Sequence, residues 1–341
     1  SIIESVGSGF LELAGKTILI TGANGFIASY FADTILFLNA TLLKKNPIKL
    51  ILLTHHKITR KSRLSHCINN PNAQFIVGDV ASVPLPNNID IIINGASKAS
   101  PKEYLGKLIE TADVNVLGTK KLLEYCVKEK ISKFLLVSSA EVYGDPDPDF
   151  IPIEEVYSGN VDQLGPRSAY QESKRFAETL CSLYWKERGI SSVIARLFHT
   201  YGPRLSLNDG RVIPEFIRRA HINEDVLIAD TGSSIRTFAY ISDSISGLWK
   251  ILIHGQTGQA YNIGSEEEID ISRLAELIIK LSNSKSRIVS IPSTQRSLSP
   301  GTPNKTTPSL RKIKTLGHTN KIPLELGLKR LIGWYKNQRA L

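Results

Sequence analysis

A tyrosine and a lysine stand four residues apart, at Tyr170 and Lys174, in a segment with a helical pattern. On a helix this spacing puts both side chains on one face, one turn apart. A nearby ammonium group favours the phenolate and lowers the tyrosine pKa, which would make Tyr170 a usable general base. An apolar strand ending at residues 138–144 precedes this pair. We expect the two segments to meet at the carboxyl edge of a sheet, where such folds hold ligands.

Two glycines and an alanine, Gly22, Gly25 and Ala28, follow the apolar run 16–20 and begin a helical pattern. The first glycine permits a tight turn, and the second lets the backbone approach a pyrophosphate. The third small residue lets the helix pack closely on the strand, with its N-terminal amides facing the anion. This pattern predicts a dinucleotide-binding turn. Its expected cofactor-binding residues are Gly22, Asn24, Gly25, Phe26 and Ile27.

The strands that follow the turn bear on the choice between NAD and NADP. Thr54 stands at the end of the second strand, where a carboxylate normally meets the adenosine ribose. Arg60 and Lys61 either meet a 2′-phosphate or are solvated charges. Asp79 is placed to accept a hydrogen bond from an adenine amino group, with a simple turn or helix cap as the alternative. We expect NAD, with NADP as the alternative cofactor, and the further cofactor-binding residues Thr54, Arg60, Asp79, Val80, Ala96 and Lys174.

Continuously apolar runs recur through the first two hundred residues. Such runs, which lack period-two alternation, are typical of strands buried on both faces of a parallel sheet. They lie at 16–20, 49–53, 74–77, 90–93, 133–137 and 192–197. We therefore predict an α/β fold, a Rossmann-like doubly wound parallel sheet with a smaller C-terminal α/β substrate lobe. The expected domains are 1–200 for NAD(P) and catalysis and 201–341 mainly for substrate, with some strand exchange.

Shorter elements follow residue 201. Helices are expected at 214–220, 243–254, 271–282 and 324–337. Residues 295–307 are rich in Ser, Pro, Thr and Gly, which predicts a long loop or lid.

Composition narrows the class of protein. With 341 residues and 42% hydrophobic residues, the chain is typical of a soluble globular protein large enough for a sizeable core. Three widely spaced cysteines favour a reducing, cytoplasmic compartment and no structural metal. No apolar run reaches the roughly 18 residues of a membrane span. The net charge of +10 is not arranged as an aromatic-studded basic stripe, so we expect no nucleic acid and no membrane as partner.

Taken in order, these motifs resemble the extended short-chain dehydrogenase/reductase family, in the branch that modifies nucleotide sugars. The resemblance covers nearly the whole chain. It is carried by the glycine turn, Asp79, the YxxxK helix, and the segments 115–119, 138–144, 196–204, 208–212, 236–243 and 261–264.

The resemblance implies an enzyme that oxidises the C4 hydroxyl of a nucleotide-diphosphate sugar. Tyr170 would remove the hydroxyl proton while hydride passes to the nicotinamide. Ser139 would hydrogen-bond the same oxygen, and Lys174 would also hold the nicotinamide ribose. Arg236 and Arg211 would bind the diphosphate, since guanidinium groups suit phosphate oxygens; for Arg236 a surface ion pair is the alternative.

The second chemical step stays open at this stage. The 4,6-dehydratases of the family resemble this chain at Glu141, the expected base at C5, but carry Asp at the position of Ala140. The UDP-glucuronate decarboxylases resemble it over 141–146 and 202–212, yet their usual C-terminal arginine is replaced by Thr306. The 4-epimerases share Ser139 and need no acid at position 141. Epimerase/dehydratase chemistry is the main expectation and UDP-glucuronate decarboxylase, a lyase, the alternative.

Further expectations concern specificity and assembly. His199 stands where the family commonly has Asn, either facing the substrate or as a packed histidine, and Arg204 is a further substrate-binding candidate. The long helices expected within 112–128 and 169–188 predict a homodimer through a four-helix bundle. Polysaccharide biosynthesis is the family's usual destination. The rival from another class is a non-catalytic dinucleotide-binding or redox-sensing protein, which the joint presence of Ser139, Tyr170 and Lys174 disfavours.

Overall fold

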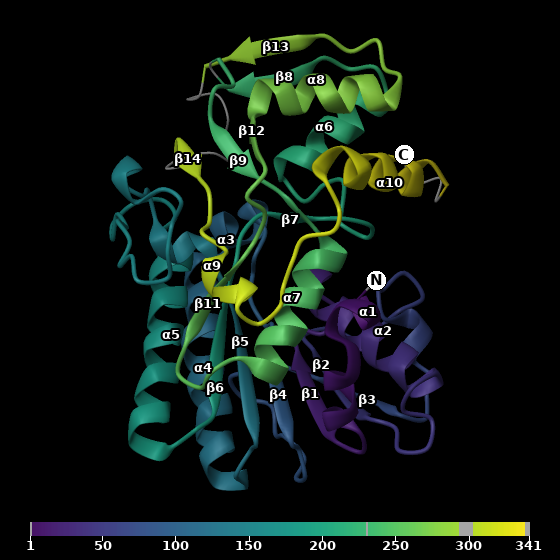
Figure 1. Ribbon diagram of the computed structural model, residues 1–341, viewed down its shortest axis with the longest axis vertical. Helices are drawn as coiled ribbons and strands as arrows, with labels where there is room; N and C mark the ends of the chain where they lie inside the picture. Colours follow the sequence, from purple (N-terminus) through teal and green to yellow (C-terminus); the bar gives the residue numbers. More distant parts are fainter. Residues whose placement is uncertain (1, 230, 293–302, 338–341) are drawn as a thin grey trace.

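The centre of the protein is a seven-stranded, wholly parallel sheet (Figure 1). The computed structural model describes residues 2–229, 231–292 and 303–337. The strand order is β11-β6-β5-β4-β1-β2-β3. The strands are β1 Thr17–Thr21, β2 Lys49–Thr54, β3 Ala73–Val77, β4 Ile91–Asn94, β5 Lys133–Ser139, β6 Ser192–Leu197 and β11 Ala260–Ile263. The predicted α/β fold with a doubly wound parallel sheet is confirmed.

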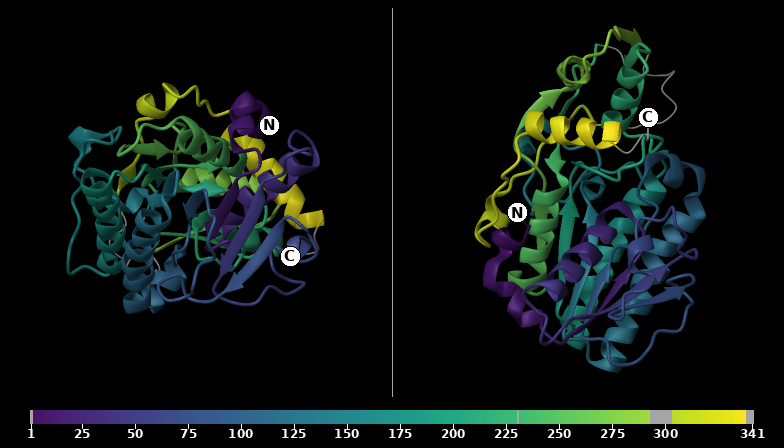
Figure 2. Two further views of the ribbon diagram at one scale, coloured as in Figure 1. Left: turned by 90° about the horizontal axis from the view of Figure 1, so that it is seen from below. Right: turned by 90° about the vertical axis from the view of Figure 1, so that its right-hand side faces the viewer.

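Helices cover both faces of this sheet (Figure 2). On one face pack α2 (Phe26–Ala40) and α7 (Ile241–His254), and on the other α4 (Leu108–Glu129) and α5 (Ser168–Arg188). Successive strand residues enter opposite cores: in β1, Ile18 and Ile20 join the first and Leu19 the second. This alternation explains why the sequence runs are continuously apolar.

The N-terminal residues are part of the core. The helix α1 (Ile2–Val6) and the 3-10 helix η1 (Gly7–Leu13) pack beside α7. Phe10 lies edge-on to Trp249 with 5.3 Å between ring centroids, and Phe31 of α2 approaches the same indole at 4.8 Å.

A smaller group of elements lies above the sheet in Figure 1. Its helices are α6 Val212–His221, α8 Ile271–Ser282 and α10 Leu324–Asn337, whereas α9 Arg311–Lys314 packs against β11 of the sheet. Its strands are β7 Thr200–Tyr201, β8 Val226–Ala229, β9 Ile235–Thr237, β10 Ala239–Tyr240, β12 Glu268–Asp270, β13 Ile288–Ile291 and β14 Lys305–Thr306. The four helices predicted after residue 201, one of which is α7 on the central sheet, are confirmed.

The chain crosses between the two parts more than once. β11 returns from the second part to pair with β6, and α7 packs on the sheet. Of the loop predicted at 295–307, residues 295–302 lie outside the described residues, whereas 305–306 form β14 beside β9. No helix in the described ranges has the combined length and apolar character to cross a bilayer.

The remaining short elements frame the carboxyl edge of the sheet. They are α3 (Pro101–Gly106) and the 3-10 helices η2 Ser65–Cys67, η3 Ala140–Tyr143 and η4 Pro148–Phe150. η3 follows β5 directly, and α3 follows β4 after a short loop. They therefore bring side chains from distant parts of the sequence to the expected site.

Candidate active site

The turn between β1 and α2 has the geometry of a dinucleotide cradle. Gly22 has φ +60°, and a Cβ there would lie 2.7 Å from the Gly95 carbonyl oxygen and 2.8 Å from Ala96 Cα. At Gly25, the residue before α2, a Cβ would lie 2.9 Å from the Gly22 carbonyl oxygen. Both positions therefore exclude a side chain, as a backbone that approaches a pyrophosphate requires.

Hydrogen bonds hold the ends of β1 and β4 together beside this turn. Thr21 Oγ1 donates to Asn94 Oδ1 at 2.7 Å and accepts from the Ala96 amide at 3.2 Å. Asn24 Oδ1 is buried and has no partner among the described residues. A buried acceptor without a donor is costly in isolation and suits a ligand hydroxyl. The turn, with Phe26 and Ile27 in the first helical turn beyond it, fits a bound dinucleotide.

The ends of β2 and β3 lie next to the turn. Thr54 Oγ1 donates to the His56 carbonyl at 2.9 Å, while Arg60 is exposed. Asp79 Oδ1 accepts from the Ala81 amide at 2.8 Å, so it caps a turn in this structure. Val80 is buried and touches α4 closely: a Cβ on Gly118 would lie 2.6 Å from Val80 Cγ1.

Side chains of helix α5 contact three successive residues of β5. Tyr170 lies against the Ser139 hydroxyl, Lys174 Nζ donates to the Val137 carbonyl at 2.9 Å, and Glu178 Oε1 accepts from Ser138 Oγ at 2.6 Å. Positions 170, 174 and 178 repeat every four residues, so one helix face carries all three contacts. The structure thus brings together Ser139, Tyr170 and Lys174, as the sequence predicted.

Burial dominates the electrostatics of this triad. Burial raises the pKa of Tyr170, whereas the hydrogen bond with Ser139 lowers it. Burial also lowers the pKa of Lys174 to about 8, and the nearby carboxylate of Glu178 limits that fall. The lysine, rather than the tyrosine, is therefore the group brought close to neutral pH.

A second aromatic residue covers Tyr170. Tyr104 of α3 stacks on Tyr170 with 4.8 Å between ring centroids and 16° between ring planes. Only 2% of Tyr104 is exposed, and its hydroxyl has no partner among the described residues. The guanidinium of Arg167 lies 5.5 Å from the Tyr104 centroid. Sequence reasoning missed Tyr104, because nothing in a six-residue helix indicates which side chain it presents to α5.

Glu141 lies in η3 and is held by two side chains of the α5 region. Arg167 Nε donates to Glu141 Oε2 at 3.1 Å, and Arg167 Nη2 pairs with Oε1. Gln171 Nε2 also donates to Oε2, at 2.9 Å. Burial disfavours the charge of Arg167, but Glu141 outweighs it and raises the pKa of Arg167. Arg167 was also missed, although its position four residues before Gln171 was a usable signal.

Two predicted substrate residues, His199 and Arg236, lie near Arg167. Arg236 is buried, and its amino groups donate to backbone carbonyls of Ile235, Pro303 and Asn304. His199 is exposed as a residue, yet the protein packed around its ring and the cations of Arg236, Arg211 and Arg167 lower its pKa to about 3. His199 therefore stays neutral at physiological pH.

Arg211 contacts the loop after β4, and Arg204 contacts α2. Arg211 donates to the Ala99 carbonyl at 3.0 Å and pairs with Asp209 at 3.1 Å. Arg204 has φ +67° and pairs with Asp33 of α2 at 2.5 Å, so its guanidinium is directed to the dinucleotide domain in this structure. Sequence reasoning missed Arg63, which donates to the carbonyls of Asn24 and Arg204, both at 3.1 Å.

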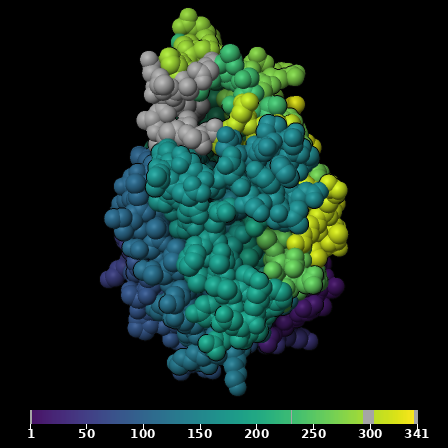
Figure 3. Space-filling view, turned by 90° about the vertical axis from the view of Figure 1, so that its left-hand side faces the viewer, coloured from purple at the N-terminus to yellow at the C-terminus, as the bar shows by residue number. Residues whose placement is uncertain are grey.

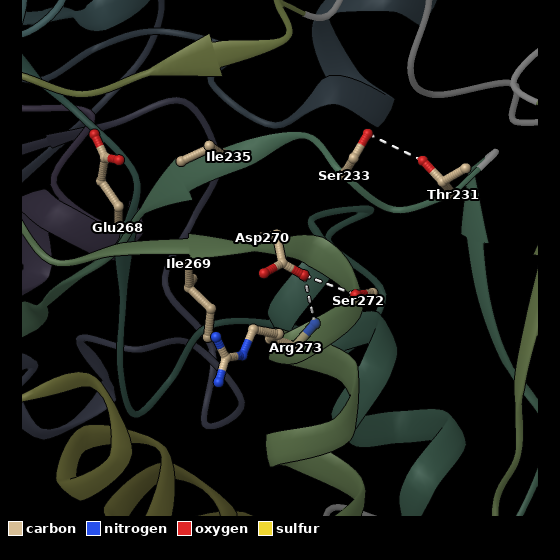
Figure 4. A pocket seen from close by; sticks show the side chains of 8 residues that line it. All are labelled: Thr231, Ser233, Ile235, Glu268, Ile269, Asp270, Ser272 and Arg273. Carbon is tan, nitrogen blue, oxygen red and sulfur yellow. Dashed lines mark hydrogen bonds between the residues drawn. The ribbon is translucent and has the colours of Figure 1, made fainter.

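A separate surface pocket of about 630 Å³ lies in the smaller part (Figure 4). It contains none of the predicted site residues. Ile235 pairs with Asp270, so these two share one face of the β12-β9-β14 sheet, and Arg236 points to the other. Asp270 is used to cap α8, accepting from the Arg273 amide at 2.8 Å. The described residues contain no cluster of His, Cys, Asp and Glu able to hold a metal ion.

A glycine cradle, an orphaned acceptor and the side chains of Ser139, Tyr170 and Lys174 lie at one sheet edge, an arrangement typical of a dinucleotide-dependent enzyme. Residues 18–264 match the NAD dependent epimerase/dehydratase family, and the chain belongs to that family. The chain is 36% identical over 332 residues to UDP-glucuronic acid decarboxylase 1 of Danio rerio, covering 95% of this chain and 73% of the relative.

Solved structures of other proteins have the same fold. The UDP-glucuronic acid 4-epimerase of Bacillus cereus, solved with UDP-glucuronic acid and NAD, superposes with a TM-score of 0.81 at 26% identity, covering 94% of this chain and 99% of that one. The UDP-glucose 4-epimerase of Thermotoga maritima shares the fold with a TM-score of 0.82 at 21% identity, covering 95% and 99%. The chain is an NAD-dependent enzyme of the epimerase/dehydratase class, as the resemblance implied.

Proposed function

We propose that this enzyme binds a nucleotide-diphosphate sugar and oxidises its C4 hydroxyl to a 4-keto intermediate. The observation that carries the proposal is the contact of Tyr170 with Ser139 beside the buried Lys174, at the edge of the sheet that holds the glycine turn. NAD supplies the hydride acceptor in the first half of the cycle and, where the product requires it, the donor in the second. The non-catalytic alternative gives no reason for a complete triad.

The chain's own groups move the proton. Tyr170 takes the proton of the C4 hydroxyl as the C4–H bond breaks, and Ser139 holds the same oxygen. The Lys174 ammonium favours the phenolate form of Tyr170 through its positive charge. The Tyr104 ring covers one face of Tyr170 and keeps water from it. Proton transfer thus takes place in a buried, preorganised setting.

For the diphosphate we propose Arg211 and Arg236, with His199 as a neutral hydrogen-bonding group beside them. The proximity of these cations to His199 supports this arrangement. Arg236 would have to exchange carbonyl oxygens of residues 303 and 304 for phosphate oxygens, which guanidinium groups bind more strongly. Residues 201–341 would then act mainly as the substrate lobe.

Glu141 is proposed to assist the second step at the neighbouring carbon. The second candidate reaction is decarboxylation of UDP-glucuronate, and the 36% identity to a UDP-glucuronic acid decarboxylase favours it. Thr306 stands where we expect the arginine of those enzymes. It pairs with Arg236 across β14 and β9, and its hydroxyl is buried without a partner among the described residues. A neutral hydroxyl suits a sugar hydroxyl better than a carboxylate, so this position favours epimerase or dehydratase chemistry.

Mass spectrometry of the products tests the proposal directly. The purified protein is incubated with UDP-, dTDP-, GDP- and CDP-sugars and uronates, with NAD and NADP in separate reactions. Loss of water indicates a dehydratase and loss of carbon dioxide a decarboxylase, while an unchanged mass with an altered NMR spectrum indicates an epimerase. Tyr170→Phe should abolish turnover and still bind cofactor. Undiminished turnover by this variant would refute the mechanism.

We further infer a homodimer formed by α4 and α5. These helices pack together and leave apolar side chains exposed, among them Ile109, Leu117, Phe176 and Leu183. Figure 3 looks onto the side of the molecule where the two helices lie. Three free, buried cysteines support a cytoplasmic location. Synthesis of a polysaccharide or glycoconjugate is the proposed role, since nucleotide sugars are activated sugar donors.

A further inference from the structure

The positive charge of the chain is concentrated around the second strand. Residues 34–78 contain seven lysines and arginines and neither aspartate nor glutamate, so they account for seven of the ten net positive charges. Lys44, Lys45 and Lys49 lie at the start of β2, whereas Lys57, Arg60, Lys61 and Arg63 follow its end. Only the second group lies at the carboxyl edge, where the cofactor turn is.

The end of β2 is placed directly beside the glycine turn. Thr21 pairs with Leu53 across β1 and β2, and the Ala23 amide donates to the Leu53 carbonyl at 3.0 Å. The next residue, Thr54, occupies the position from which a carboxylate normally accepts the 2′-hydroxyl of the NAD ribose. Its hydroxyl donates to the His56 carbonyl instead. This position therefore carries no negative charge that would repel a phosphate.

The nearest acidic residues along the chain are both engaged elsewhere. Asp33 pairs with Arg204 at 2.5 Å and with His66 at 2.8 Å. Asp79 accepts from the Ala81 amide at 2.8 Å. Lys57, Arg60 and Lys61 are exposed in the loop after β2.

Arg63 ties this loop to the cofactor turn. Its Nη1 donates to the Asn24 carbonyl and its Nε to the Arg204 carbonyl, while Nη2 makes no hydrogen bond within the described part of the chain. The side chain is partly buried, so its charge is only partly screened by solvent. A guanidinium fixed at two nitrogens with a third donor to spare is suited to a phosphate oxygen.

We propose that the adenosine end of the cofactor site accepts a 2′-phosphate, so that the enzyme binds NADP at least as tightly as NAD. Arg63 is the fixed cation of this subsite, and Lys57 and Arg60 are its exposed ones. The inference rests on the dinucleotide-dependent function proposed above and deepens it. It adds NADP to the NAD used by the family, because Thr54 replaces the discriminating carboxylate.

Binding rather than turnover tests this proposal. Titration calorimetry of the full chain compares NADP with NAD, and 2′,5′-ADP with 5′-AMP as fragments that differ by the 2′-phosphate. We expect NADP to bind at least as tightly as NAD, and 2′,5′-ADP about tenfold or more tighter than 5′-AMP, since hydrogen bonds to charged groups are worth that much. Tenfold tighter binding of NAD, or equal binding of the two fragments, overturns the proposal.

Two sets of variants locate the phosphate. Thr54→Asp should weaken NADP binding about tenfold or more and spare NAD binding. The double variant K57A/R60A, which changes only exposed side chains, should also weaken NADP binding about tenfold or more and spare NAD binding. The control K44A/K45A removes equal charge from the other end of β2 and should leave both affinities within about twofold.

The outcomes separate this proposal from the function on which it rests. Equal losses of NADP affinity in K57A/R60A and K44A/K45A would indicate general attraction of a polyanion and would refute a 2′-phosphate subsite. Binding of NAD with rejection of NADP would refute the subsite and leave the proposed function intact. Binding of neither dinucleotide would refute the proposed function itself.

Discussion

Replacing Glu178 by glutamine removes a negative charge from beneath Lys174 and keeps the size of the side chain. Glu178 pairs with Arg196 at 2.7 Å, with 10% and 15% of the two side chains exposed, and accepts from Ser138 at 2.6 Å. Removing one partner of such a buried pair costs about 3–5 kcal/mol, because the other charge stays buried. Glutamine can keep a hydrogen bond with Ser138, so we expect about 3 kcal/mol.

This loss is measurable as a fall in melting temperature. An unfolding entropy of about 2.1 cal/mol/K per residue gives about 0.7 kcal/mol/K for this chain, so about 3 kcal/mol lowers the Tm by about 4 °C. The matched control is Glu172→Gln on the same helix, where an exposed pair with Arg175 at 3.5 Å contributes at most about 1 kcal/mol. If both variants melt within about 1 °C of each other, the contribution of about 3 kcal/mol assigned to the Arg196–Glu178 pair is wrong.

The same substitution should also move the pH dependence of the first chemical step. Glu178 raises the pKa of Lys174 against the effect of burial, which lowers it to about 8. Without Glu178 this pKa falls further, so less ammonium is present at neutral pH to favour the Tyr170 phenolate. We expect cofactor reduction by E178Q to decline at neutral pH and its lysine-dependent limb to shift to lower pH. A pH profile that superimposes on that of the wild type would show that Glu178 has only a structural role.

Three further predictions concern single side chains. Burial lowers the pKa of Lys174 to about 8, and a free lysine titrates near 10.4, so between these values the unfolded chain binds more protons and stability rises with pH. Lys174→Met removes this ammonium and should melt at or above the wild-type temperature at pH 7 while losing turnover; a large destabilisation would contradict the burial argument. His199 stays neutral above about pH 4, so His199→Asn should leave the pH profile between about 5 and 9 unchanged, and a lost titration there would assign that limb to His199. Phe176→Asp on the exposed face of α5 should convert a dimer to a monomer in light scattering, whereas a monomeric wild type would rule the dimer out.

The sequence was most informative where local chemistry fixes the structure. The glycine turn could be predicted because Gly22 and Gly25 have no room for a Cβ. Tyr170, Lys174 and Ser139 could be predicted because helix period and strand direction place them at one edge. Phe10 packs on Trp249, a contact between residues far apart in the sequence that no local pattern reveals.

Residues whose partners come from other elements were harder to place. The sequence predicts a substrate contact for both Arg204 and Arg236, because it does not distinguish an arginine that is free to bind a ligand from one that is held by other parts of the protein. In the structure Asp33 holds the first and carbonyls of residues 303–304 hold the second. Tyr104 lies on Tyr170 because α3 follows β4 at the sheet edge, which is a property of the topology.

The contacts of Glu141 connect the two halves of the proposed cycle. Arg167 and Gln171 donate three hydrogen bonds to the Glu141 carboxylate, so a proton taken up by Glu141 would neutralise the partner of the Arg167 ion pair and weaken these bonds. Arg167 also lies over Tyr104, and Tyr104 is stacked on Tyr170. A shift of Arg167 that frees Glu141 therefore disturbs the group that covers the first general base. The residues for the first proton transfer and those for the second step form one packed unit, and their substitutions should be strongly non-additive.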